Sequence, residues 1–360
     1  MRFASRLWIA LLLVGAQSSA FAWSAKEHIM LTRMAARELI SEPGTPAEMK
    51  EWLQQAIADV PDMAAEEKYF LTAKVGKEPK GLSGLLMYAF LPDIHQFRDR
   101  RDSKVQPFNV HERMLHFIDV ELFIKGKGQR EYKDNLSNKP AIEDIPHDMN
   151  DPRYQQAGML PLRMEYCMAK LVDAIKAGRM NDSAEQLEKE DDSATRWAGY
   201  LAHYAEDNTQ PQHATIDYKS ASYFKNPRKA PNVHSEVEFR MVDDEVDEFP
   251  QLRRDYWALL VKELETAKDT TPSDDPFRAT IEVSLRSYDA LPLIGAAARQ
   301  ALIDLPGNGA DKIDTEKFFR YLGKWNGGES TVMQMKAHQQ AWAVKRVKRL
   351  WVKAWQDASH

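Results

Sequence analysis

The residues best suited to chemistry lie in one segment, Tyr200-Leu-Ala-His-Tyr-Ala-Glu-Asp-Asn-Thr-Gln-Pro-Gln-His213. His203 and Asp207 are four residues apart, so on a helix they project from the same face and can bind one metal ion. Pro211 ends the helix because it lacks a backbone N–H, and the turn after it brings His213 back towards the pair. This spacing predicts a metal site. Polar residues before the proline are expected to orient the ligands: Asn208, Thr209 and Gln210.

Three further places in the chain carry residues of the same kinds. His234 and Glu238 repeat the four-residue spacing of a histidine and a carboxylate. His116 lies between apolar residues, and Asp93 directly follows an apolar stretch. Taken one at a time, these residues have ordinary explanations, namely an exposed helix pair, a satisfied core histidine and an N-cap aspartate.

The N-terminal segment adds two more candidates. A positively charged start, an apolar run over residues 7–16 and the tripeptide Ala20-Phe-Ala22 predict a secretory signal peptide, cleaved after Ala22. The protein is therefore expected to be secreted or periplasmic. Cleavage would expose the α-amine of Trp23, which can chelate a metal together with the carbonyl oxygen of the same residue. His28, five residues on, would reach the same ion if a helix starts just after Trp23.

Composition excludes several classes of protein. The 360-residue chain has a formal net charge of −5, so it is not a strongly basic binder of nucleic-acid backbones, and any affinity for phosphate must be local. Cys167 is the only cysteine, which we interpret as a small buried hydrophobe within a helix. No apolar run after the signal peptide is long enough to predict a membrane span.

Helical periodicity dominates the rest of the chain, and no alternating strand pattern is evident. A helix is expected to begin near Ala47, after the capping signal Thr45-Pro46. Further helices are expected over the following ranges: 25–41, 61–74, 160–177, 194–206, 232–246, 250–267, 276–303 and 330–356. Residues 99–110 and 126–156 are predicted to be long loops. No repeat or low-complexity linker divides the chain, so residues 23–360 are predicted to form a single all-α domain.

The motifs, taken in order along the chain, resemble those of the superfamily of zinc-dependent phospholipases C and single-strand-specific zinc nucleases. The matching residues are Trp23, His28, Asp93, His116, His203, Asp207, His213, His234 and Glu238. The resemblance runs from the mature start to about residue 245, through short motifs separated by dissimilar stretches. It implies an all-helical fold in which three zinc ions line a cleft.

The resemblance also implies how the ligands are shared among the three ions. One zinc would be held by Asp93, His116, His203 and Asp207, its neighbour by Trp23, His28 and the bridging Asp207, and the third by His213, His234 and Glu238. Nitrogen and oxygen ligands without thiolate suit zinc, although other divalent metals use them too. A water shared by the paired ions would attack phosphorus, and Asp93 would accept or hold its proton. Asp99 and Asp102 are the alternatives to Asp93.

The substrate class stays open between the two branches of the superfamily. The short spacing between Trp23 and His28 resembles the spacing in the nucleases. The dipeptide Trp23-Ser24 and a glutamate as the last ligand, Glu238, resemble the phospholipases. Lys26 stands where the similar choline-preferring phospholipases have a glutamate, which argues against a choline cage.

The residues just after His116 could form a base subsite. In the nucleases the matching aromatic and acidic residues bind a base, so Phe117 could stack on one and Asp119 could hydrogen-bond its edge. The alternative for Phe117 is packing in the core.

The C-terminal stretch from Met335 to Trp355 is both basic and rich in tryptophan. It could lie on an anionic membrane or follow a nucleic-acid backbone. The alternative is an amphipathic helix that packs its tryptophans on the body of the protein. The residues concerned are Lys345, Arg346, Lys348, Arg349, Lys353, Trp342, Trp351 and Trp355.

These observations favour a trinuclear-zinc phosphodiesterase that acts on single-stranded nucleic acid and on nucleotide 3′-phosphates. A phospholipase C with a head-group preference other than choline is the second hypothesis. A zinc-storing protein without enzymatic activity is the third. No obligate protein partner is inferred.

Overall fold

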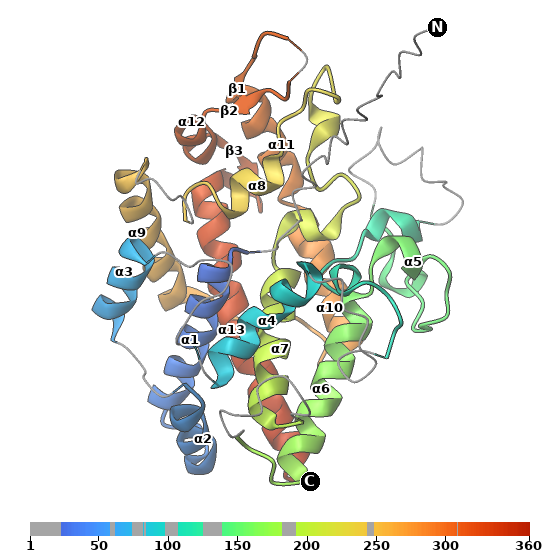
Figure 1. The fold of residues 1–360 in the computed structure, drawn as a ribbon, viewed down its shortest axis with the longest axis vertical. Helices are drawn as coiled ribbons and strands as arrows, with labels where there is room; N and C mark the ends of the chain where they lie inside the picture. Colours follow the sequence, from blue (N-terminus) through green and yellow to red (C-terminus); the bar gives the residue numbers. More distant parts are fainter. Residues whose placement is uncertain are drawn as a thin grey trace, which may run out of the picture.

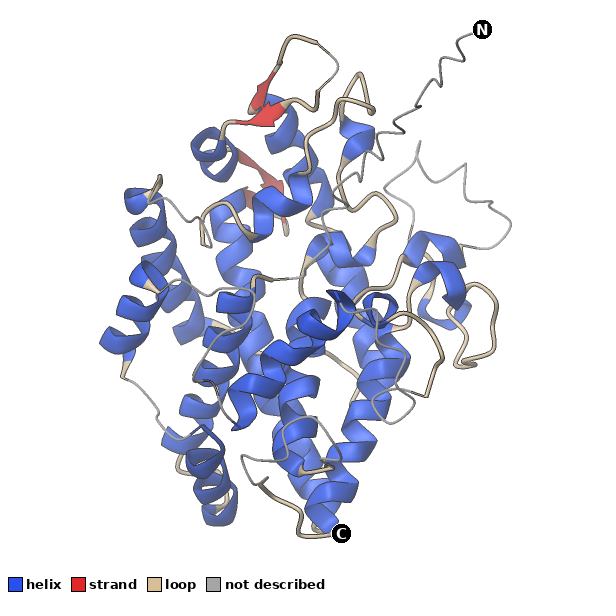
Figure 2. Cartoon of the chain, in the orientation of Figure 1, coloured by secondary structure: helices blue, strands red, loops and turns tan. Residues whose placement is uncertain are grey.

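The computed structural model describes residues 23–57, 62–73, 82, 84–97, 107–124, 139–181, 192–242, 248–307 and 309–360. Within them the fold is all-α, as predicted (Figures 1 and 2). The α-helices are α1 (Ala25–Ser41), α2 (Ala47–Ile57), α3 (Met63–Thr72), α4 (Gly84–Phe97), α5 (Tyr154–Ala157), α6 (Leu160–Lys176), α7 (Ala194–Asn208), α8 (Val233–Glu238), α9 (Pro250–Thr266), α10 (Pro276–Tyr288), α11 (Leu291–Gln300), α12 (Thr315–Arg320) and α13 (Val332–Ala358). The predicted signal peptide lies outside the described residues.

Short 3₁₀ helices and two small sheets complete the described structure. The 3₁₀ helices are η1 (Glu112–Leu115), η2 (Val120–Phe123), η4 (Ile142–Asp144), η5 (Pro211–Ala214) and η6 (Ala221–Tyr223). Each sheet has two antiparallel strands, β1 (Leu302–Ile303) with β2 (Lys312–Ile313), and β3 (Leu322–Trp325) with β4 (Gly328–Thr331). The sheets lie together at one end of the molecule (Figure 2).

Helix α7 forms the centre of the molecule. It packs against α1, α4, α6 and α13, which come from both ends of the chain (Figure 1). Every residue of α7 except Arg196 is buried, so its polar residues have no access to bulk water. A helix that is buried on all sides must satisfy its polar groups within the protein. The polar residues concerned include His203, Glu206 and Asp207.

The local sequence explains where the two helices nearest the site begin and end. Ser24 caps α1, and its side chain and that of Glu27 form a capping box. Ser193 caps α7 in the same way, by accepting a hydrogen bond from the backbone N–H of Arg196. Helix α7 ends two residues beyond the predicted boundary, before Pro211 starts η5.

Two of the predicted helices are too long. The range 276–303 divides into α10 and α11, because Pro292 cannot lie inside a continuous helix and instead occupies the first turn of α11. In the described part of the range 232–246, the helix is the six-residue α8, and residues 239–242 form turns. In the predicted loop 126–156, the described part contains η4 and the start of α5.

Two short hairpins are present although the sequence shows no alternating strand pattern. The hairpin of β3 and β4 turns at Asn326-Gly327, and both residues have positive φ angles, of 50° and 80°. Asn-Gly is the dipeptide that a type I′ hairpin turn requires. The signal was therefore present in the sequence, next to Trp325.

Helix α13 packs its tryptophans on the body of the protein. Trp342 and Trp351 are buried, and the ring of Trp355 stacks on that of Trp52 with centroids 6.0 Å apart. Its basic residues meet carboxylates, since Lys345 and Lys348 contact Glu38, Arg349 contacts Asp274, Arg346 contacts Asp269 and Lys353 contacts Asp357. The structure therefore has the amphipathic helix that packs on the body of the protein, which was one of the alternatives for this stretch. No helix in the described ranges is long and apolar enough to span a membrane.

Replacing Gly199 by alanine is expected to destabilise the protein. Helices α4 and α7 approach so closely there that a Cβ atom would lie 2.5 Å from Cβ of Tyr88 and 2.8 Å from the carbonyl oxygen of Leu85. Overpacking of this kind costs about 1–3 kcal/mol of unfolding free energy. Chemical denaturation measures the loss. Gly44→Ala is the control, because nothing lies within 4 Å of its added Cβ, and equal stability of the two variants would contradict the prediction.

Candidate metal centre

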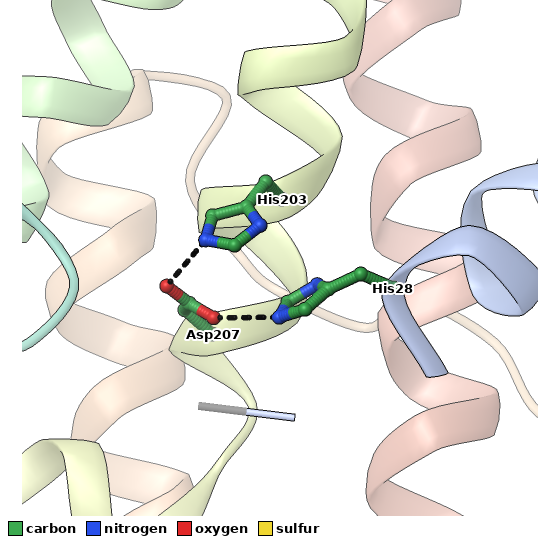
Figure 3. A group of neighbouring side chains, drawn as sticks. All are labelled: His28, His203 and Asp207. Atoms are coloured by element: carbon green, nitrogen blue, oxygen red, sulfur yellow. Dashed lines mark ion pairs between the residues drawn. The ribbon is translucent and has the colours of Figure 1, made fainter. Parts of the chain in front are cut away.

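His203 and Asp207 project from one face of α7, as their spacing predicts, and meet His28 of α1 (Figure 3). The distance from His28 Nε2 to Asp207 Oδ1 is 3.3 Å, and that from His203 Nε2 to Asp207 Oδ2 is 3.4 Å. The two imidazole rings stack with centroids 4.0 Å apart. The two oxygens of Asp207 thus face different histidines, which is the arrangement that a bridging carboxylate needs.

Asp93 and His116 lie close to the same Nε2 atom of His203. The distance from His203 Nε2 to Asp93 Oδ1 is 3.9 Å, and that from His116 Nδ1 to Asp207 Oδ2 is 2.9 Å. Asp93 lies inside α4 rather than at an N-cap, one residue after Pro92. His116 directly follows η1. The alternatives, Asp99 and Asp102, lie outside the described residues.

A separate group contains His213, His234 and Glu238. The distance from His234 Nε2 to Glu238 Oε1 is 2.9 Å, and that from His213 Nε2 to the same oxygen is 3.7 Å. The two imidazole rings lie parallel, at 7°. In each of three sets, the potential ligand atoms lie within 4.8 Å of one another: His28, His203 and Asp207; Asp93, His116 and His203; His213, His234 and Glu238.

Several of these buried atoms make no hydrogen bond in the described structure. They are His28 Nε2, Asp93 Oδ2, His116 Nε2, Asp207 Oδ1, His234 Nε2 and Glu238 Oε2. Leaving a buried polar atom unsatisfied costs about 1–3 kcal/mol, so such atoms are rare unless something binds them. His116 and His234 are thus not satisfied core histidines. The donor set of imidazole nitrogens and carboxylate oxygens fits zinc or a similar divalent ion.

Burial shifts the pKa values of these ligands strongly. It raises the pKa of Asp93 to about 7 and lowers that of His203 to about 3. Burial likewise raises the pKa of Glu238 and lowers that of His234. Asp207 is the exception, because its contacts with His203, His116 and His28 outweigh burial and hold its pKa well below the usual range. A divalent cation would favour the ionised carboxylates and the neutral imidazoles together.

Trp23 lies at the start of the described chain, fully buried beside α7. Its indole Nε1 donates to the backbone oxygen of Glu206 at 2.9 Å and to Oγ1 of Thr209 at 3.3 Å. The backbone N–H of His28 bonds to the carbonyl oxygen of Ser24 at 3.0 Å, so α1 begins directly after Trp23. The residue that signal cleavage would make the N-terminus is therefore held at the C-terminal end of α7, the helix that carries Asp207.

Glu206 is a site residue that the sequence analysis missed. Its Oε2 lies 2.6 Å from Nδ1 of His28, and its Oε1 accepts a hydrogen bond from Thr32 at 2.9 Å. A carboxylate on the second nitrogen of a metal-binding histidine fixes its tautomer and strengthens it as a ligand. No local pattern could have found it, because its partner His28 is 178 residues away in the sequence.

Other ligands are oriented in a similar way. Nδ1 of His203 bonds to the carbonyl oxygen of Ala89 at 2.8 Å, which leaves Nε2 as the metal-facing atom. Nε2 of Gln210 donates to Glu238 at 3.0 Å, as the sequence predicts for this turn. Asn208 instead donates to Ser284 and to the carbonyl oxygen of Thr280 in α10, so it stabilises the packing of helices.

The predicted substrate residues lie beside the centre. Phe117 is half-buried, and its ring lies where a side chain on Gly158 would clash with it. Asp119 is buried, which raises its pKa well above the usual range. Lys26 is also buried and points towards the carbonyl oxygen of Val242, so it does not face a head group.

Scans of the chain against models of known protein families and against curated proteins give no match. A function therefore has to be inferred from the chemistry of this site and from the resemblance of its motifs.

Replacing Asp93 by asparagine is expected to stabilise the metal-free protein above neutral pH. With a pKa raised to about 7 by burial, against 3.8 ordinarily, the carboxyl group is ionised at pH 8 in a place that disfavours charge. Each pKa unit corresponds to about 1.4 kcal/mol, so the unfolding free energy should rise by a few kcal/mol at pH 8. The gain should shrink towards pH 4, where Asp93 is protonated in the fold. Urea denaturation with a chelator measures it.

With saturating zinc the sign should reverse, because asparagine is a poorer ligand than aspartate. Asp173→Asn, at an exposed position of α6, is the control. It should leave the unfolding free energy unchanged both without metal and with saturating zinc. A loss of metal-free stability in the Asp93 variant at pH 8 would show that the carboxylate contributes to folding without a metal.

Proposed function

We propose that the protein is a trinuclear-zinc phosphodiesterase that prefers single-stranded nucleic acid and nucleotide 3′-phosphates. The observation that carries the proposal is the convergence of buried ligand atoms without hydrogen-bond partners at six of the nine positions of the superfamily motif, in three groups of potential ligands. Two of the groups share His203 and also meet through Asp207, whose Oδ2 lies 2.9 Å from His116, whereas the third group is separate. This arrangement suits the paired ions and the third ion that the resemblance implies.

Zinc bound here would polarise the phosphate and acidify a water molecule near neutral pH. The chain's own residues would prepare this chemistry. Asp93 is fully buried and holds an oxygen without a partner next to His203, so it can accept the proton of the attacking water. Glu206 fixes the orientation of His28 through Nδ1, which leaves Nε2 facing Asp207. Gln210 holds the carboxylate of Glu238 in place.

The position of Phe117 and Asp119 supports a nucleic-acid substrate. Both follow His116 on a segment tied to the site, since the N–H of Ile118 bonds to the carbonyl oxygen of His213 at 2.9 Å. Half-burial of Phe117 leaves part of the ring open to stack on a base. The buried carboxyl group of Asp119 can hydrogen-bond a base edge.

Parallel assays of the protein processed to begin at Trp23 test the proposal. We expect hydrolysis of single-stranded DNA and RNA, and no turnover of phosphatidylcholine, -ethanolamine or -glycerol. Phe117→Ala should raise KM for nucleic acid more than it lowers kcat, because it removes stacking worth about 1–3 kcal/mol.

Asp207→Asn is the control against a contaminating nuclease and should be inactive. Release of lipid head groups without cleavage of nucleic acid would contradict the nuclease proposal and support the phospholipase C alternative. A zinc-loaded protein that is inert on every phosphodiester would favour zinc storage.

A further inference from the structure

The buried ammonium group of Lys336 lies between two of the three ligand groups. Lys336 belongs to α13 and is fully buried. Its Nζ lies 2.7 Å from Oε1 of Glu27 and donates to the carbonyl oxygen of Val237 at 2.7 Å. The same ammonium lies 5.3 Å from the ring centroid of Trp23, within reach of a cation–π contact.

The contact with Glu27 leads to the N-terminal ligands. While one oxygen of Glu27 faces Lys336, the other accepts the backbone N–H of Ser24 at 3.1 Å. That bond fixes the peptide unit between Trp23 and Ser24, which contains the Trp23 carbonyl. As the first residue of the processed chain, Trp23 would otherwise be poorly ordered, as chain termini usually are. Lys336 thus restrains Trp23 twice, at the ring and through Glu27.

The contact with Val237 leads to the separate group. Val237 precedes Glu238 in α8, a helix of only six residues. So short a helix depends on its surroundings for stability. By binding the Val237 carbonyl, Lys336 fixes the backbone from which Glu238 projects, and its positive charge also stabilises the Glu238 carboxylate.

We infer that Lys336 is a positioning residue that holds the N-terminal ligands and the His213/His234/Glu238 group in place from one buried charge. The inference rests on the proposed zinc centre and extends it. The contacts of Lys336 with Glu27 and Val237 do not lead to the set of Asp93, His116 and His203. Its loss should therefore weaken two zinc positions and spare one.

The test compares zinc content at a fixed, buffered free zinc concentration. Lys336→Met alone would leave Glu27 as a buried unpaired charge, so it is combined with Glu27→Gln. The wild-type protein should keep three zinc ions per chain, and the double variant about one. The single variant Glu27→Gln keeps the bond from Lys336 to Val237. Its amide has one oxygen in place of two, which cannot bind both Lys336 and the N–H of Ser24, so the restraint on the N-terminal ligands weakens and about one ion should be lost.

A matched double variant separates positioning from general stability. Arg346 and Asp269 form another buried ion pair of α13, with Nη1 and Oδ2 3.2 Å apart. Arg346→Met with Asp269→Asn should lower the metal-free unfolding midpoint but keep all three ions. A zinc content of three ions in K336M/E27Q would overturn the inference. If that double variant does not fold, a zinc content of three ions in the single variant E27Q would overturn it instead. A wild-type protein without zinc would instead refute the proposed function.

Discussion

The structure depends on one electrostatic constraint, the burial of carboxylates that the protein itself does not neutralise. Asp93 and Glu238 are fully buried, and each faces an imidazole that burial keeps neutral, in His203 and His234 respectively. By contrast, Glu66 meets Arg33 and Asp269 meets Arg346, so these acids are neutralised by basic side chains. A divalent cation at the proposed centre would supply the missing positive charge, and without one these buried carboxylates oppose folding.

This constraint explains why distant parts of the chain meet at α7. Helix α1 brings His28, with Trp23 just before its N-cap, α4 brings Asp93, and the segment after η1 brings His116. Each of these parts is tied by ordinary bonds before any metal binds, such as those from the Trp23 indole to Glu206 and from His203 to the carbonyl oxygen of Ala89. The ligands are thus preorganised, so binding energy need not be spent on ordering the chain.

Much of this arrangement could be predicted because the decisive signals are local. A four-residue spacing places His203 and Asp207 on one face of any helix, and Pro211 ends that helix wherever it lies. Local signals also define α1, α6 and α9. The hairpin at Asn326-Gly327 was predictable in the same way, although its strands are too short to show an alternating pattern.

Other features could not be predicted because they depend on contacts between distant residues. Nothing near Glu206 reveals that it meets His28, since the two are 178 residues apart. Lys336 reads as one more cation of an amphipathic helix until Glu27 and Val237 are placed beside it. The burial of Lys26, which the sequence aligns with a head-group position, likewise follows only from the packing of α1.

Elemental analysis of the active protein, processed to begin at Trp23, tests the central claim most directly. Three zinc ions per chain are predicted, and their removal by a chelator should abolish activity and lower the melting temperature. An active protein with one ion or none, or a melting curve that a chelator leaves unchanged, would contradict it.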